Sequence, residues 1–408
     1  MYIFRPLLIG MIILSANIGS IFANTLSVDS IIRNVLSSHP NILAAKAQKE
    51  ALLKNVLQSQ LGLNPDFEIS LGQKTDGISN GSTIETGLRQ TFLFPGKSEA
   101  KKSLSQGEVS LQDIEIERLR ASLANALLVK LYERDYVGKR RIANQTRISR
   151  LNFVKDYLSS RPFVSPQKRL ELKLVESKLR EHQMDEIQLK AQLEELSSQL
   201  EIFGEIPEFV ELAQVPFDTD VLTSSRPKAQ SLEAKSILSH IQQLERESNL
   251  LDLEAKPDFD VLGKFASGAA SGTDQSMSLG IGLELPFTNK TSYSQQALIY
   301  KKKGLEYQLN QLKKEQDVQW IEVLITLKKS QDILSLYSNS WLKQLETSLL
   351  QTLNDFKRGQ VDLLSVLELD TQWGEALMKQ YEAKLDWIKS YGKGRQLLGY
   401  AELKGEKL

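Results

Sequence analysis

The stretch "TFLFPGKSEA", residues 91–100, marks a change of structure along the chain. An apolar run ends at Pro95–Gly96, and charged residues follow. Pro95 cannot donate a hydrogen bond to a sheet but suits the first turn of a helix, and Gly96 lets the chain turn. The letters "GKS" also end a phosphate-binding P-loop, but the glycine that this motif requires five residues before Gly96 is replaced by Thr91. The stretch therefore predicts a strand that ends and a long helix that begins near Lys97.

A second copy of the same pattern lies later in the chain. "NPDFEISLG" is echoed by "KPDFDVLGK", and their prolines, Pro65 and Pro257, are 192 residues apart. "TFLFPGK" is echoed by "LELPFTN", with Pro95 and Pro286 separated by 191 residues. We therefore expect two copies of a helix, two strands and a long helical hairpin, with strand-to-helix junctions at Pro95, Gly96 and Pro286.

Long helices are predicted after each pair of strands. No proline intervenes between Gly96 and about Tyr157, and the residues there are good helix formers. Apolar residues step by three and four from Leu172 to Leu200 and again from Leu364 to Ile388, which is typical of a narrow coiled-coil seam. The breaks "SSRPFVSPQ" and "FKRGQVD" each separate two such runs, so each predicts the tip of an antiparallel helical hairpin.

Four segments alternate with a period of two, at about 66–74, 83–94, 257–266 and 277–286. Apolar residues share one face of each segment, and the charged residues lie on the other. A soluble sheet buries its apolar face, whereas an outer-membrane barrel turns that face to lipid and its polar face to a water-filled lumen. The periodicity alone leaves both open. Four strands cannot close a barrel, but three copies would supply twelve. Under the barrel interpretation the lumen-facing residues are Glu68, Glu85, Arg89, Asp260, Lys264 and Glu284.

The composition excludes several classes of protein. The 408 residues include 51 basic and 51 acidic side chains, and this balance gives no support for a nucleic-acid partner. The chain contains no cysteine, which excludes disulfides and cysteine-ligated metals. The three histidines are far apart, and we expect His182 to be a packed polar residue of a helical seam rather than a metal ligand with Glu186. We find no catalytic motif, so the sequence predicts no enzyme, no metal site and no cofactor.

The first 23 residues carry one charge, at Arg5, and an apolar run that ends in small residues at Ala23. This pattern is typical of a secretory signal peptide. The domain organisation that we expect is a signal peptide at 1–23, a first repeat at 24–203, a linker at 204–225, a second repeat at 226–400 and a tail at 401–408. Within the repeats, the helical hairpins are expected at 96–203 and 288–400.

This order of elements resembles the TolC-type outer-membrane efflux channel family over roughly residues 28 to 400. "RQTFLFPGK" is similar to the family's strand-to-helix junction, notably in the heavy-metal efflux branch, and "FKRGQVDLLSVLELDTQ" to its second hairpin tip. The resemblance implies a mainly α-helical homotrimer with four strands per chain in a twelve-stranded barrel in outer-membrane lipid. It also implies a periplasmic adaptor protein and an inner-membrane pump as partners. The function implied is a passive duct, with metal cations, drugs and secreted polypeptides open as cargo.

The resemblance also suggests functional residues. Acidic residues often narrow the periplasmic mouth in this family, and counting from Gly359 places the two usual acidic positions at Ser365 and Glu368. Asp362, one turn nearer the tip, is a further mouth candidate. Ser365 departs from the acidic pattern, and a solvated helix residue is an equally good interpretation of Glu368. Adaptor-contact candidates at the two tips are Ser160, Arg161, Phe163, Ser165, Arg358, Gly359, Gln360 and Val361. The main alternative function is a soluble periplasmic coiled-coil scaffold whose strands form a small buried sheet, and a phosphate-transfer enzyme built on "GKS" is a weaker one.

Overall fold

The computed structural model describes residues 28–75, 80–160, 165–204, 206, 231–268, 274–283 and 290–399. Several predictions fall outside these residues: the signal peptide at 1–23, most of the 204–225 linker, the tail at 401–408, and the site candidates Arg161, Phe163, Glu284 and Pro286. The elements in chain order are α1 (Val28–Ser38), α2 (Pro40–Gln58), β1 (Asp66–Thr75), β2 (Asn80–Phe92), α3 (Lys97–Ser159), α4 (Pro166–Glu201), α6 (Leu232–Glu254), β3 (Phe259–Gly268), β4 (Asp274–Leu283), α7 (Lys290–Leu336), α8 (Asn339–Lys357) and α9 (Leu363–Leu398).

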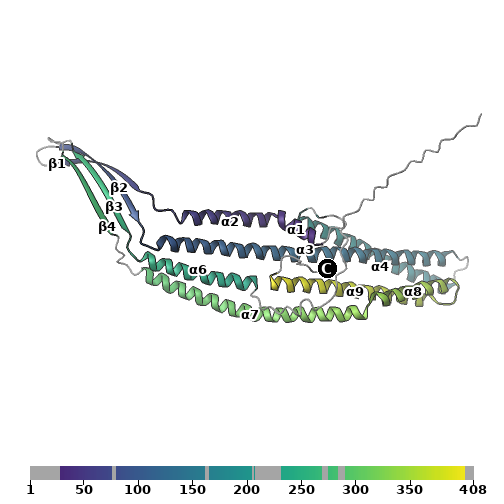
Figure 1. Ribbon diagram of the computed structural model, residues 1–408. Coiled ribbons are helices and arrows are strands. Elements are labelled where there is room, and N and C mark those ends of the chain that lie inside the picture. The colour runs from purple at the N-terminus through teal and green to yellow at the C-terminus, as the bar shows by residue number, and fades with distance from the viewer. Residues whose placement is uncertain are drawn as a thin grey trace, which may run out of the picture.

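The molecule is elongated, with a small sheet at one end and long helices running away from it (Figure 1). The predicted fold class is confirmed: the chain is mainly α-helical, and the order of helix, strand pair and helical hairpin occurs twice. The sheet is antiparallel with the strand order β1-β2-β3-β4. Its central pair, β2 with β3, joins the two repeats, and Phe92 lies opposite Phe259 with their rings stacked 5.2 Å apart.

The helices nearest the sheet lie side by side in the same order along the chain as the strands. α2 packs on α3, α3 on α6, and α6 on α7. Farther from the sheet, α3 packs with α4 and α9, and α9 packs with α7 and α8. The largest core lies where α1, α3, α7 and α9 meet, around Leu127, Leu327 and Trp387, and a second core around Val154, Val175 and Leu363 holds the far end together.

Two details differ from the predictions. The strands begin or end up to three residues away from the expected bounds, and β3 begins at Phe259, two residues after Pro257, which cannot donate to a sheet. The second hairpin is expected at 288–400 without an internal break in its first arm being specified, and that arm consists of two helices: α7 ends at Leu336 and α8 begins at Asn339. Ser338 caps α8, because its side chain accepts a hydrogen bond from the Trp341 backbone N–H.

Candidate functional site

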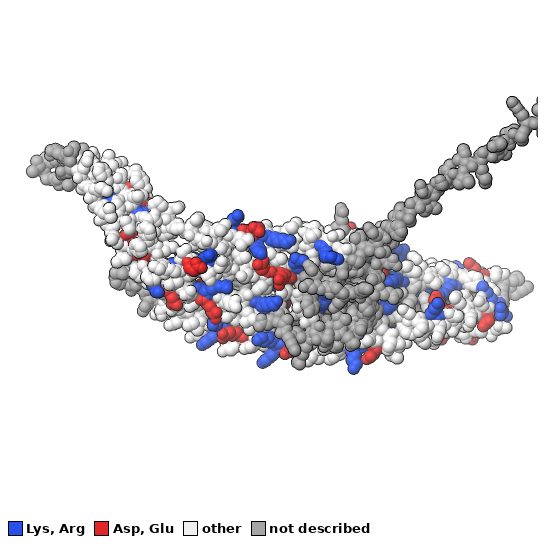
Figure 2. All heavy atoms as spheres, viewed as in Figure 1, with Lys and Arg blue, Asp and Glu red and all other residues white. Residues whose placement is uncertain are grey.

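One face of the sheet is apolar and uncovered. The pairing of the strands puts Phe67 opposite Leu88 and Val261 opposite Ile281, so the apolar rows of neighbouring strands lie side by side. Most of these side chains are strongly exposed, and Ile281 is 78% exposed. In Figure 2 this end of the molecule is almost free of charged side chains on the visible face. The exposed apolar residues of the sheet are Phe67, Ile69, Leu71, Ile84, Leu88, Phe92, Phe259, Phe265, Met277, Leu279, Ile281 and Leu283.

The opposite face of the sheet carries the charges. Successive residues of a strand point to opposite faces, so residues one position away from the apolar row share the other side. Arg89 lies opposite Asp66, Glu85 opposite Ser70, and Lys264 opposite Gly87. The register thus gathers five of the predicted lumen-facing residues on one face: Glu68, Glu85, Arg89, Asp260 and Lys264. That this face lines a lumen stays a prediction.

Both edges of the sheet are free within the part of the chain that the structure describes. β1 pairs only with β2, and β4 pairs only with β3. Each edge strand is ten residues long and therefore presents a row of unpaired backbone N–H and C=O groups. Such an edge, next to an exposed apolar face, is a surface that a further strand would complete.

The junction between β2 and α3 explains the "GKS" letters. Gly96 has a left-handed backbone with a φ of 94°, as expected of a glycine that turns the chain. Lys97 is buried, its Nζ lies 2.8 Å from Asp258 Oδ1, and it also donates to the Lys256 carbonyl oxygen at 2.7 Å. Asp258 in turn accepts from the Phe94 backbone N–H. The lysine therefore holds the start of β3 against the end of β2, and it is not free to bind a phosphate.

The helix ends that flank the two hairpin tips lie together at the end far from the sheet (Figure 1). Tyr157 donates from its hydroxyl to the Lys357 carbonyl oxygen at 2.7 Å, and its ring meets Phe356 edge-on. Ser165 caps α4, and Gly359 turns the second tip with a φ of 76°. Ser160, Arg358 and Gln360 are exposed and Val361 is half-buried, so these candidates are accessible to a partner in a single chain.

The mouth candidates lie at the start of α9 and differ in what they do. Asp362 is the N-cap of α9: its Oδ1 accepts from the Ser365 backbone N–H at 2.9 Å, and the hydrogen bonds from Ser365 hold the pKa of this carboxyl below its usual range. Ser365 and Glu368 are exposed, and Glu368 accepts a hydrogen bond from Gln372. They continue into an exposed polar stripe with three- and four-residue steps: Gln372, Glu375, Lys379, Glu382 and Asp386.

A buried ionic cluster next to this stripe escaped the sequence analysis. The side chain of Asp370 is 7% exposed, and it pairs with Arg147 Nε at 2.8 Å and Arg150 Nη1 at 3.4 Å. Arg150 also pairs with Glu346 of α8 at 3.0 Å and stacks over Trp373. The cluster ties α3 to α8 and α9. The sequence indicates the cluster only through Asp370, an acidic residue three positions before Trp373, where the helical spacing predicts a residue of the same buried face.

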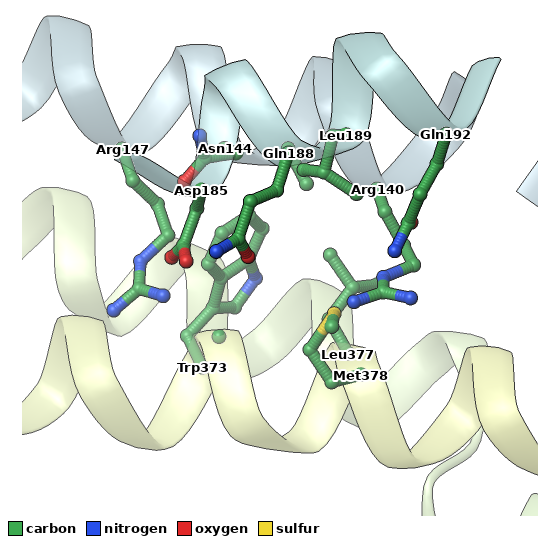
Figure 3. Close-up of a pocket in the computed structure, with 12 residues that line it drawn as sticks. Arg140, Asn144, Arg147, Asp185, Gln188, Leu189, Gln192, Trp373, Leu377 and Met378 are labelled. Atoms are coloured by element: carbon green, nitrogen blue, oxygen red, sulfur yellow. The ribbon is translucent and has the colours of Figure 1, made fainter. Parts of the chain in front are cut away.

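A cavity of about 180 Å³ lies beside this cluster, between α3, α4 and α9 (Figure 3). On its α3 wall Asn144 bonds twice to α4: its amide donates to the His182 carbonyl oxygen at 2.8 Å, and its Oδ1 lies 3.0 Å from His182 Nδ1. Burial and the nearby Arg147 lower the pKa of His182. Glu186 accepts from Arg141 and Gln145 instead of facing His182. His182 is therefore a packed polar residue between two helices, as expected.

No helix among the described residues is both long and apolar enough to cross a membrane. Those residues also contain no group of three or more acidic, histidine or cysteine side chains arranged to hold a metal ion.

No protein-family model and no curated protein matches the sequence. Solved structures do match its fold. The CmeC outer membrane channel of Campylobacter jejuni is similar with a TM-score of 0.72 at 13% identity, over 93% of this chain and 87% of that one. The outer membrane protein VceC of Vibrio cholerae is similar with a TM-score of 0.71 at 13% identity, over 91% of this chain and 96% of that one. The Neisseria gonorrhoeae MtrE outer membrane channel in its open state is similar with a TM-score of 0.70 at 13% identity, over 92% of this chain and 89% of that one. The chain therefore has the fold of the TolC-type outer-membrane channels.

Proposed function

We propose that this protein is the outer-membrane channel of a tripartite efflux or secretion system, a passive exit duct that makes no chemical change to its cargo. The observation that carries the proposal is the sheet whose apolar face is uncovered and whose two edges are unpaired. The fold shared with CmeC, VceC and MtrE supports it.

The soluble scaffold accounts poorly for this sheet. A buried sheet needs a layer over its apolar face, yet Leu71, Met277 and Ile281 are each at least 77% exposed. Contiguous apolar patches of this kind mark contact with a membrane or another protein. In lipid the unpaired backbone groups at the edges would be prohibitively costly, so a membrane sheet must close into a barrel. We therefore assign lipid contact to the apolar row and the lumen to the charged face.

Closure requires further copies of the chain. Outer-membrane barrels have eight or more strands, and this chain has four described strands. We propose three copies and a barrel of twelve strands, in which β4 of one copy pairs with β1 of the next. The helices would then extend into the periplasm. An inner-membrane pump would supply the energy, and a periplasmic adaptor would meet the two hairpin tips. Metal cations and drugs are the cargo classes that we favour.

At the mouth, three copies of Glu368 would place carboxylates around one pore, which attracts cations and resists anions. Glu368→Gln is therefore expected to lower the ratio of cation to anion permeability in planar bilayers, with the conductance preserved. Ser365→Ala, one turn earlier on the same exposed stripe, is the matched control and should leave the ratio unchanged. An unaltered ratio in the Glu368→Gln channel would return Glu368 to the solvated helix residue of the alternative interpretation.

Two experiments test the proposal as a whole. After cell fractionation, the channel should remain with the outer membrane, whereas the soluble scaffold would be released with the periplasm. The purified protein, reconstituted in planar bilayers, should then give ion conductance. Release with the periplasm, or correctly inserted trimers that conduct nothing even with Glu368 and the tip altered, would defeat the channel proposal.

A further inference from the structure

The N-terminal part of α7, which is nearest the sheet, carries an exposed row of tyrosines. Tyr293, Tyr300 and Tyr307 are seven residues apart, and their side chains are 74%, 71% and 74% exposed. Ala297 and Gly304 lie between them on the same side, since residues three and four apart are neighbours on a helix. An exposed ridge of large aromatic rings separated by small residues is unusual for a helix that faces only water, and tyrosine is enriched in protein interfaces.

The opposite side of α7 is already occupied. Lys302 Nζ pairs with Glu245 of α6 at 2.7 Å, Gln295 donates to Asp252 of α6, and Leu298 and Leu309 are buried. α6 is thus the neighbour on one side, and within the described residues the tyrosine ridge has no helix against it. α2 occupies the corresponding position at the other end of the layer, because it packs on α3 and leaves its far side exposed.

The contact between α3 and α6, inside one chain, shows how such helices meet. Gln243 of α6 donates to the Leu104 carbonyl oxygen of α3 at 2.8 Å. A Cβ on Gly107 of α3 would collide with the side chains of Gln243 and Arg246. Here α6 contributes the large residues and α3 contributes the hollow. This is the seam at which β2 also pairs with β3.

The internal repeat transfers this seam to the free edges. α3 corresponds to α7. The two helices begin at Lys97 and Lys290, 193 residues apart and two more than the offset of the preceding prolines, so Gly107 corresponds to Tyr300. The orientation of the residues around the helix supports that offset. Gln112 of α3 donates to the Ala45 carbonyl oxygen of α2, and because α6 is the counterpart of α2, the counterpart of Gln112 should lie on the side of α7 that faces α6. That counterpart is Leu305, which lies one turn after Lys302 on the α6 side of α7.

α6 corresponds to α2, and Gln243 corresponds to Ala51 at the offset of 192 given by the prolines. The exposed side of α2 around Ala51 also carries Ala44 and Ala47. The large and the small residues are therefore exchanged between the seam of α3 with α6 and the free edges at α7 and α2. Inside the chain, large residues of α6 cover a glycine of α3; at the free edges, α7 offers tyrosines and α2 offers alanines.

We infer that the tyrosine ridge of α7 seats on the alanine surface of α2 in a second copy of this chain, with Tyr300 against Ala51 and Tyr307 against Ala44 and Ala47. The contact is head-to-tail, and such contacts build a closed ring when the rotation between copies closes. In the helices next to the sheet, this contact lies between the same two copies as the proposed pairing of β4 with β1 of the next copy. The inference therefore rests on the proposed trimer.

Cysteine cross-linking tests this contact directly, because the chain has no cysteine of its own. The double variant Tyr300→Cys with Ala51→Cys should, on mild oxidation of the outer-membrane trimer, form covalent dimers and trimers. The matched control pairs Ala51→Cys with Ile299→Cys. Ile299 is also exposed, but it lies about 100° around the helix from Tyr300, and it should give little cross-linked product.

A size exchange gives a second readout. Tyr300→Ala and Ala51→Tyr should each lower the temperature at which the trimer dissociates in detergent, the first by leaving a void and the second by overpacking. The combined variant should recover most of that loss. Trimers that cross-link through Ile299 instead of Tyr300, or that show no recovery, would overturn this inference and leave the channel intact. A chain that is monomeric in the membrane would instead defeat the proposed function itself.

Discussion

Lys97 Nζ and Asp258 Oδ1 lie 2.8 Å apart, and this ion pair joins the end of the first strand pair to the start of the second. The lysine is almost fully buried and lies at the point where β2 becomes α3. A buried lysine that loses its carboxylate is left as an uncompensated charge, which is far more costly than the loss of an exposed pair.

Asp258→Asn is therefore expected to destabilise the protein by roughly 3 kcal/mol, the lower end of the range for breaking a buried pair. Asp113→Asn is the control, because Asp113 and Lys49 form a pair of similar length, 2.7 Å, that is much more exposed. Its loss should cost less than about 1 kcal/mol. The measurement is the midpoint of thermal unfolding in detergent, and equal shifts for the two variants would contradict a buried lock at the junction.

The predictions from sequence succeeded where the signal is local and repeated. Alternation identified the four strands that the structure describes and assigned their charged and apolar faces, because the period of two needs only neighbouring residues. It did not define the strand ends, since alternation says nothing about where pairing stops. The break before α8 was readable: Ser338, followed by Asn339 and Ser340, is the kind of residue that caps a helix.

The contacts between distant segments could not be read in the same way. Lys97 stood out as part of "GKS", but nothing near it in the sequence names Asp258 as its partner. Asp370 receives its two arginines from α3, more than two hundred residues earlier in the chain. Such clusters depend on how the helices pack together. The sequence shows only that a charge occurs at a position where apolar residues are expected.

The Asp370 cluster should be a major determinant of stability in the helical half. Asp370→Asn leaves Arg147 and Arg150 without their shared carboxylate, so we expect a loss of roughly 3 kcal/mol. Glu346→Gln removes the other partner of Arg150, but the Glu346 side chain is 42% exposed, and its loss should cost less than about 1 kcal/mol. Thermal unfolding of both variants measures the difference. A larger effect of Glu346→Gln would show that Asp370 is not the centre of the cluster.

Acid should weaken the contact between α3 and α4 through His182. Burial and Arg147 lower its pKa, although Asp370, Asp185 and Glu181 act in the opposite direction, and Asn144 bonds to its Nδ1. The unfolded chain therefore binds a proton at a higher pH than the folded one does. The stability present above the ordinary pKa of histidine, about 6.5, is lost as the pH falls below that value.

The comparison that isolates this effect is between the wild-type protein and His182→Gln at pH 7.5 and pH 5.5. The wild type should lose more stability than His182→Gln over this interval, because only the wild type has an imidazole that binds its proton more weakly in the folded chain than in the unfolded one. Ionisable groups far from His182 are the same in both proteins, so their contributions cancel in the difference. Parallel pH profiles would mean that His182 does not change its protonation equilibrium on folding.

The two faces of β4 separate a membrane sheet from a soluble one. Leu279 is 75% exposed in the apolar row, and Ser278 is exposed on the opposite face. An arginine on the lipid face of an outer-membrane barrel costs about 2–4 kcal/mol near the middle of the bilayer, whereas an arginine in a wet lumen costs little. Leu279→Arg should therefore reduce the amount of protein assembled in the outer membrane, and Ser278→Arg should assemble normally with altered ion selectivity.

The soluble scaffold predicts a different result for the same pair of variants. If the apolar face of the sheet were covered by protein, Leu279→Arg and Ser278→Arg would both remain in the periplasmic fraction, and neither would change an outer-membrane signal. The measurement is the amount of each variant in the outer-membrane fraction relative to the wild type. Equal assembly of both variants in the outer membrane would show that Leu279 does not face lipid, because only a residue on the lipid face has to transfer its arginine into the bilayer.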